Sequence, residues 1–185
     1  MTNKFIISAL IFICTFSCTH RQSLQPEQYI KALKEISNEL KFSFNHNNYI
    51  FSFDYRPSDL FLAEQLQNSV QNKNTLMSKY NGLHYFILTI TPNFKDSLIT
   101  SGLKDYVFQK MESEITLIVE GQTVFPSIYT VENLGNSDDS ARVFIGFETQ
   151  MHDINKCQIQ FKESYFKQAQ FSINIPTSKL PILKI

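Results

Sequence analysis

The sequence predicts a mainly β domain of the α+β class, an antiparallel β-sandwich of about seven to eight strands with short helical additions. Aromatic residues are abundant, with 17 Phe and 8 Tyr among 185 residues, so the chain can bury a substantial core. Several segments alternate apolar and polar residues with a period of two, which is typical of half-buried strands. Signals for parallel βαβ crossovers are few, and this favours antiparallel pairing.

The first eighteen residues have the features of an export signal. Lys4 precedes an uncharged run from Phe5 to Phe16, and Ser17-Cys18 follow it. A basic start, a short apolar stretch and a small residue before the cleavage point are typical of a signal peptide. The apolar run is shorter than the about 20 residues that a membrane-spanning helix needs.

The residues Thr15-Phe16-Ser17-Cys18 resemble the lipobox of a bacterial lipoprotein. Thr15 replaces the favoured Leu and Phe16 is bulky, as in the loosened lipoboxes of Bacteroidota. The resemblance implies cleavage before Cys18 and attachment of several acyl chains, palmitate among them, which together hold a protein firmly at a membrane. The alternative is ordinary secretion with cleavage near Ser17.

The sequence divides into three parts on this basis. We expect residues 1–17 to be the lipoprotein signal peptide and residues 18–25 to be a polar tether. Residues 26–185 are expected to form a single β-sandwich-like domain with a helical insert near 57–81.

Lipidation of Cys18 would also decide the state of the thiols. Cys14 would leave with the signal, so Cys157 alone would remain, and the exported domain would have to be stable without a disulfide. Cys157 occupies an inward position of a predicted strand, so we expect it to be a small core residue.

In its signal, its size and its richness in Asn, Lys, Phe and Ile, the chain resembles the small uncharacterised lipoproteins of Bacteroidota. In that phylum, surface export is associated with acidic residues just after the lipidated Cys, and "CTHRQS" contains none. The resemblance implies a protein of the bacterial cell envelope, anchored by lipid in the outer membrane on its periplasmic side. The 17 basic residues balance the 17 acidic ones without a basic stripe, so no nucleic-acid partner is expected.

From Pro26 to about Ser37, apolar residues recur at helical spacing. Pro suits the first turn of a helix, so the segment predicts an amphipathic helix that begins the domain.

The stretch "LKFSFNHNNYIFSFDY", residues 40–55, alternates apolar and polar residues on both sides of a polar centre. It predicts a β-hairpin with a two-residue turn at His46-Asn47 and with Phe44 opposite Tyr49. In that register every large side chain lies on one face, which we expect to form a wall of the core. An exposed aromatic platform for glycan or peptide is the alternative.

A helical insert and a central strand follow. Pro57 opens "PSDLFLAEQLQNSV", and a second short helix comes after it and stops at Gly82. Residues 83–91, "LHYFILTIT", are apolar on both faces, so this strand is expected inside a sheet that is covered on both sides.

The second half of the chain adds one helix and further strands. Helical spacing predicts a short helix within 101–114. Strands are predicted on both sides of a tight turn at Gly121-Gln122, and Pro126 demotes the second of them to a sheet edge or forces a bulge. Residues 133–140 have the composition of a loop. The last three strands are predicted at 141–149, 157–161 and 171–175.

No motif predicts a catalytic, cofactor or metal site. The chain has four histidines: His20, His46, His84 and His152. No pair of them has the spacing of a zinc site. Asp153 beside His152 could orient an imidazole, but no Gly-x-Ser-x-Gly elbow supplies a nucleophile. The spacing of the remaining candidate acids predicts neither a calcium-binding loop nor a carboxylate pair for glycoside hydrolysis. These acids are Asp138, Asp139, Glu112, Glu114 and Glu132.

Three functions remain open at this level. The first, which we favour, is a non-enzymatic binding or scaffold module held at the membrane by Cys18, with contacts to envelope proteins through a sheet edge near Pro126 or through the helical insert. The second is a subunit of an envelope or secretion machine, because some secretion-system lipoproteins resemble a small β-sandwich with an added helix. The third is a hydrolase whose site is assembled from distant residues such as His84 or His152.

Overall fold

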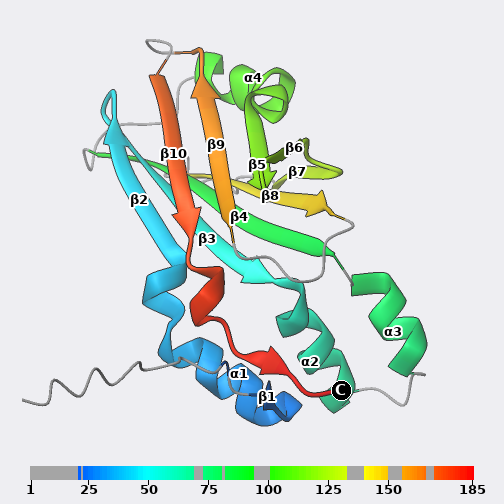
Figure 1. The fold of residues 1–185 in the computed structure, drawn as a ribbon. Coiled ribbons are helices and arrows are strands. Elements are labelled where there is room, and N and C mark those ends of the chain that lie inside the picture. The colour runs from blue at the N-terminus through cyan, green and yellow to red at the C-terminus, as the bar shows by residue number, and fades with distance from the viewer. Residues whose placement is uncertain are drawn as a thin grey trace, which may run out of the picture.

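A computed structural model describes residue 21 and residues 23–68, 73–80, 82–93, 101–132, 140–149, 156–165 and 169–185. Over these ranges the chain forms two facing antiparallel sheets, of five and four strands, with four α-helices (Figure 1). The predicted class, a mainly β sandwich with helical additions, is therefore confirmed. The described strands number eleven rather than seven or eight, because two of them are only two residues long and one predicted strand is divided in two.

The larger sheet has the order β2-β3-β4-β8-β7. Its strands are Lys41–His46, Tyr49–Pro57, Leu83–Pro92, Ala141–Glu148 and Ile128–Glu132 in that order. The smaller sheet has the order β10-β9-β5-β6. Its strands are Ala169–Ile175, Cys157–Glu163, Ile115–Val119 and Gln122–Val124. A short parallel pair joins the two ends of the domain: β1, Ser23–Leu24, and β11, Ile182–Leu183.

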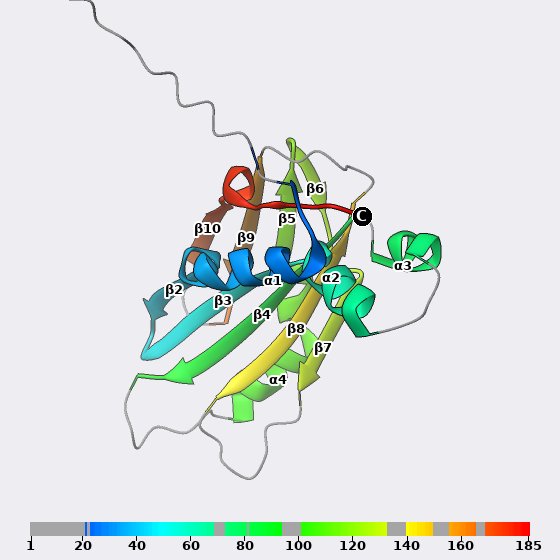
Figure 2. The same cartoon turned by 90° about the horizontal axis from the view of Figure 1, so that it is seen from below.

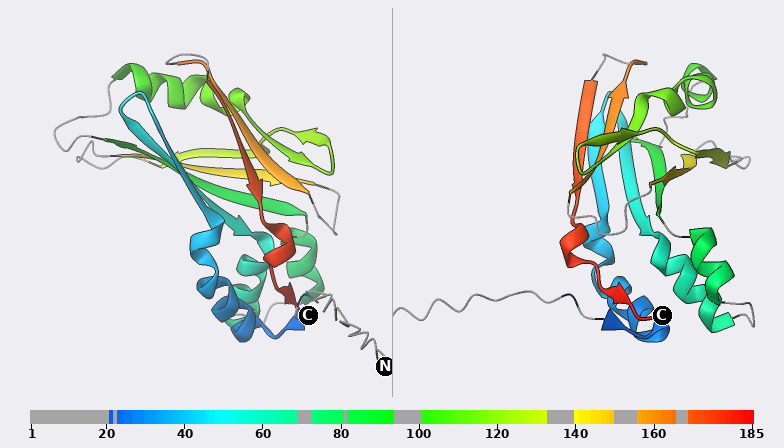
Figure 3. Two further views of the ribbon diagram at one scale, coloured as in Figure 1. Left: turned by 60° about the vertical axis from the view of Figure 1, so that its left-hand side comes forward. Right: turned by 45° about the vertical axis from the view of Figure 1, so that its right-hand side comes forward.

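The helices gather at opposite ends of the sandwich. At one end lie α1, α2 and α3, beside β1 and β11, whereas α4 lies at the other end (Figures 2 and 3). The four helices are Pro26–Glu35, Ser58–Asn68, Lys73–Tyr80 and Ser101–Gln109. Short 3₁₀ turns follow at Ser37–Leu40, Met111–Glu114 and Thr177–Lys179. The predicted stop after the second helix of the insert is correct, since α3 ends at Tyr80 and Gly82 has a φ of 74°.

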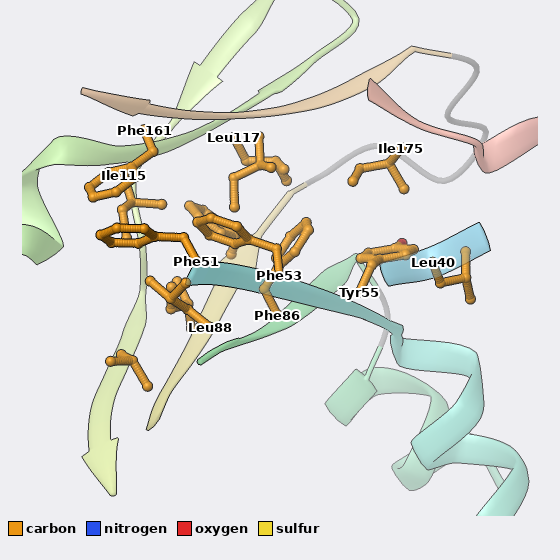
Figure 4. Close-up of a cluster of buried hydrophobic side chains, with 14 of the residues drawn as sticks. Leu40, Phe51, Phe53, Tyr55, Phe86, Leu88, Ile115, Leu117, Phe161 and Ile175 are labelled. Atoms are coloured by element: carbon orange, nitrogen blue, oxygen red, sulfur yellow. The ribbon is translucent and has the colours of Figure 1, made fainter. Parts of the chain in front are cut away.

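The strand at 83–91 was expected to be central, and β4 is the third of the five strands. Its inward residues Phe86 and Leu88 are fully buried. They pack with residues of β3, such as Phe51 and Phe53, against the inward face of the smaller sheet (Figure 4). Phe161 of that sheet meets Phe51 with 5.8 Å between ring centroids. Each such ring removes roughly 150–250 Å² from water, so this aromatic layer contributes substantially to stability.

The β2–β3 hairpin has the predicted faces but a different register. The turn lies at Asn47-Asn48, with φ values of 45° and 67°, instead of at His46-Asn47. Phe44 therefore pairs with Phe51 and not with Tyr49. A two-residue turn of this kind needs positive φ at both central residues, which Asn adopts more readily than His. A shift of two residues leaves every side chain on its original face, so the predicted core wall is confirmed for the fully buried residues of β3, whereas Phe42 and Phe44 of β2 are half-buried.

The segment Gln122–Glu132 passes from one sheet to the other. Its first half, β6, is the outer strand of the smaller sheet, and its second half, β7, is the outer strand of the larger one. Pro126 lies at the crossing, where it interrupts the strand as its missing N–H predicts. The turn before β6 lies at Glu120-Gly121, one residue earlier than expected, because these two residues take the positive φ values, 48° and 85°.

No helix within the described ranges has the length and apolar character needed to span a membrane.

Candidate functional site

Several residues singled out by the sequence lie outside the described residues. They are Cys18, His20, Asp138, Asp139, His152 and Asp153. The lipidation of Cys18 and the proposed role of His152 therefore stay predictions.

His84 is buried inside the sandwich near the helical end. The hydroxyl of Tyr55, on the neighbouring strand, forms a hydrogen bond with His84 Nδ1 at 3.0 Å. Burial lowers the pKa of His84 from 6.5 to about 4, since a charged imidazole would lose its hydration. His84 is thus a neutral core residue at physiological pH.

Other titratable groups lie near this pair. Burial raises the pKa of Tyr55, and the nearby groups Cys157, Tyr29 and Asp59 raise it further. Desolvation also raises the pKa of the Asp59 carboxyl. Within the part of the chain that the structure covers, no carboxylate hydrogen bonds to His84. A triad needs a carboxylate that orients the histidine and a hydroxyl that the histidine activates. The described part of this cluster lacks the orienting carboxylate.

Cys157 is a core residue, as its alternation predicts. Its side chain is buried, and burial, followed by the charge of Glu120, raises the pKa of its thiol to about 12. The nucleophilic form of cysteine is the thiolate, so this thiol is unreactive while the protein is folded.

Two of the candidate acids, Glu114 and Glu132, have hydrogen-bond or ion-pair partners. The carboxylate of Glu114 accepts hydrogen bonds from the hydroxyls of Tyr106 and Ser164. Glu132 lies on β7, where its carboxylate is 3.3 Å from Arg142 on the exposed outer face. Both acids therefore have structural partners. Among the residues described, no group of three or more His, Cys, Asp or Glu side chains is arranged to hold a metal ion.

One polar contact was missed by the sequence analysis. His46, expected at a turn tip, is the last residue of β2, and its Nε2 lies 3.1 Å from Oε2 of Glu163. The carboxylate of Glu163 has no exposed surface, whereas 16% of the His46 side chain is exposed. The sequence pattern could have predicted this contact, because Glu163 continues the inward alternation of Cys157, Ile159 and Phe161. A charged residue at an inward strand position needs a partner.

An open groove lies between the free edges of β2 and β10. We call it the edge groove. It has a volume of about 550 Å³ and is lined by Phe42, Ser43, Phe44, Phe171, Ser172, Ile173 and Asn174. The apolar members are half-buried and the polar members are exposed. Phe44 and Phe171 stack with 3.9 Å between ring centroids and so form its floor.

Two other surfaces lie where the sequence predicts contacts. A recess between α1, α2 and β3 has room for only about 130 Å³, below the roughly 300–1,000 Å³ of typical small-molecule sites. The edge near Pro126 carries an exposed aromatic residue, since Phe125 is 63% exposed. It lies between the outer strands of the two sheets, where the sequence analysis expected a contact surface.

Comparison with known proteins gives little guidance. No protein-family model matches the chain, and no curated protein matches it. Among solved structures, the chain is similar to a protein from Burkholderia pseudomallei K96243 that is described as a novel protein of unknown function. The two are 12% identical over 85% of this chain and 93% of that chain, with a TM-score of 0.38. A similarity at this level carries no argument about function.

Proposed function

We propose that this protein is a non-enzymatic binding module, a lipoprotein of the bacterial envelope that holds an extended segment of another envelope protein in its edge groove. The observation that carries the proposal is the pair of strand edges that flank an aromatic-lined groove. Within the described residues, neither β2 nor β10 has a second strand partner. A free edge is a template for an added strand.

The backbone of β2 supports this mode of binding. In an antiparallel hairpin closed by a two-residue turn, the residues beside the turn form a hydrogen-bonded pair, and bonded and non-bonded pairs then alternate. His46 pairs with Tyr49 beside the turn, so the N–H and C=O groups of Lys41, Ser43 and Asn45 point away from β3. They point outward from the free edge of β2, and Ser43 among them lines the edge groove.

The side chains of the edge groove add apolar contact to these backbone groups. Phe42, Phe44 and Ile173 are only partly buried, so an added segment would cover apolar surface that water now contacts. Ser43 and Asn174 stand at the rim. In strand addition, backbone hydrogen bonds supply affinity and side-chain contacts supply specificity. The partner expected here is an extended segment with apolar residues at alternate positions.

Anchoring is the second part of the proposal. It rests on the signal and lipobox-like residues that end at Cys18, and on the tether between Cys18 and the first strand. The anchor would be in the outer membrane, on its periplasmic side. Mass spectrometry of the mature protein tests it: we expect an N-terminal Cys18 that carries acyl chains. An unmodified N-terminus, or a Cys18→Ser protein that fractionates with membranes as the native one does, would contradict it.

Site-specific photocrosslinking in intact envelopes tests the binding mode. A crosslinking residue at Ser172, inside the edge groove, is expected to capture a defined partner, whereas one at exposed Lys162 is not. Ser43→Pro removes one outward N–H without taking a bond from the β2–β3 ladder, so it should abolish the capture. Ser43→Ala keeps that N–H and serves as the matched control. Equal products from Ser172 and Lys162, or full capture by Ser43→Pro, would refute strand addition at this edge.

A further inference from the structure

The parallel strands β1 and β11 at the helical end turn alternate side chains toward the core and toward solvent. Ser23 pairs with Ile182, and Leu24 pairs with Leu183. Leu183 is buried and Leu24 packs against the core. Ile182 is 46% exposed, and Lys184, two residues further on, lies on the same side as Ile182. We call Ser23, Ile182 and Lys184 the anchor face.

The anchor face lies close along the chain to Cys18. Ser23 is the fifth residue after Cys18, and an extended chain covers at most about 3.6 Å per residue, so their Cα atoms lie within about 18 Å of each other. Ile182 is directly opposite Ser23 in the ladder, about 4.8 Å further away. An acylated Cys18 would therefore hold this end of the domain beside the headgroup layer of the bilayer.

The charge around the anchor face matches a lipid surface. Residues 19–26 contain Arg21, and the acid Glu27 follows them in the first turn of α1, whereas residues 177–185 contain Lys179 and Lys184 and no acid side chain. Lys179 forms an ion pair with Glu39, which leaves Lys184, two residues after the exposed Ile182, as the cation of the anchor face. A Lys or Arg beside an apolar residue is the combination that binds the interface of an anionic bilayer.

We infer that the anchor face docks onto the anionic phospholipid surface of the membrane that holds Cys18, so that the domain has a fixed orientation instead of swinging on its tether. This inference rests on the lipidation in the proposed function. The strands β2 and β10 run between the helical end and the α4 end (Figure 1). Docking at the helical end therefore directs the edge groove away from the bilayer surface, so that it is open to periplasmic partners.

The test uses the lipidated mature protein in vesicles of phosphatidylethanolamine with phosphatidylglycerol. A polarity-sensitive dye is attached to Ser23→Cys at the anchor face, or to Ser113→Cys near α4 as the matched control site. Cys157 is buried and Cys18 is acylated, so neither competes for the dye. Quenching by a nitroxide-labelled lipid is expected at position 23 and not at position 113.

Substitutions then separate docking from mere proximity. Ile182→Asp should abolish the quenching at position 23, whereas Phe108→Asp, an exposed apolar residue of α4, should leave it unchanged. Lys184→Gln should lower the ratio of docked to undocked protein about fivefold. Removing phosphatidylglycerol from the vesicles, or raising the salt concentration, should lower this ratio too, because each weakens the attraction between the lysine and the lipid surface.

The possible failures are distinguishable. An N-terminus without acyl chains overturns both the anchoring and the docking. An acylated Cys18 with equal quenching at positions 23 and 113, or with no effect of Ile182→Asp, overturns the docking alone. Shielding of position 23 that requires added envelope proteins would show that a protein covers the anchor face, and this result also overturns the lipid assignment.

Discussion

The imidazole of His46 lies 3.1 Å from the carboxylate of Glu163, although 117 residues separate them in the chain. His46 ends β2 in the larger sheet, and Glu163 ends β9 in the smaller one. Because the Glu163 side chain is completely buried, this contact links the two sheets at a position that water does not reach. It fixes the end of the edge groove nearest α4.

Removal of the imidazole should therefore weaken the sandwich. We expect His46→Ala to lower the free energy of unfolding by about 1–3 kcal/mol, the usual effect when a buried acceptor loses a partner. Urea unfolding measures the change. Asn45→Ala, an exposed neighbour on the same strand, is the control and should change stability by less than about 0.5 kcal/mol. Equal effects of the two substitutions would show that the contact with Glu163 does not stabilise the fold.

The buried His84 should make stability depend on pH. Its pKa falls from 6.5 to about 4 on folding, so between these values the unfolded chain binds a proton that the folded chain does not. The contribution of neutral His84 to the free energy of unfolding is therefore complete above pH 6.5 and is lost as the pH falls towards 4. The loss amounts to about 3 kcal/mol over this interval.

The test is a comparison of native protein with His84→Asn. Urea unfolding at several pH values between 7 and 4 should show a steeper decrease in stability for the native protein. The difference between the two curves isolates the titration of His84 from that of the carboxyl groups. Parallel curves would mean that the folded protein accepts a proton at His84 without cost.

Much of the fold follows from local patterns in the sequence, and the parts that do not follow depend on pairing over long distances. The alternation of residues 40–55 assigns the correct faces to β2 and β3, because a side chain's face depends only on parity. The edge groove is different, since Phe44 and Phe171 meet through the order of strands in two sheets. No local pattern encodes that order.

The turn of the β2–β3 hairpin offers a test of why its predicted register was wrong. Asn48 has a φ of 67°, so Asn48→Ala should lower stability by about 1–2 kcal/mol through the strain of a Cβ in the left-handed region. Asn48→Gly, which has no such strain, should be neutral or slightly stabilising. Urea unfolding of both variants gives the comparison. If Ala and Gly had the same effect, backbone conformation would not be what sets this register.

Two glycines with the same backbone requirement should differ strongly on substitution. Gly82 and Gly121 have φ values of 74° and 85°. A Cβ at Gly121 would meet nothing within 4 Å, whereas a Cβ at Gly82 would lie 2.0 Å from the backbone oxygen of Thr149. Gly121→Ala should therefore cost only the conformational strain, about 1–2 kcal/mol.

Gly82→Ala should cost more, because a backbone oxygen cannot rotate away as a side chain can. The Thr149 N–H donates to the Gly82 carbonyl oxygen at 2.7 Å, so any shift that relieves the clash also disturbs the contact between the ends of β4 and β8. We expect Gly82→Ala to exceed Gly121→Ala by at least about 2 kcal/mol, in the range of overpacked cores. Thermal or urea unfolding of the two variants measures the difference. Equal losses would show that the chain between α3 and β4 can move away from Thr149 without disturbing the sheet.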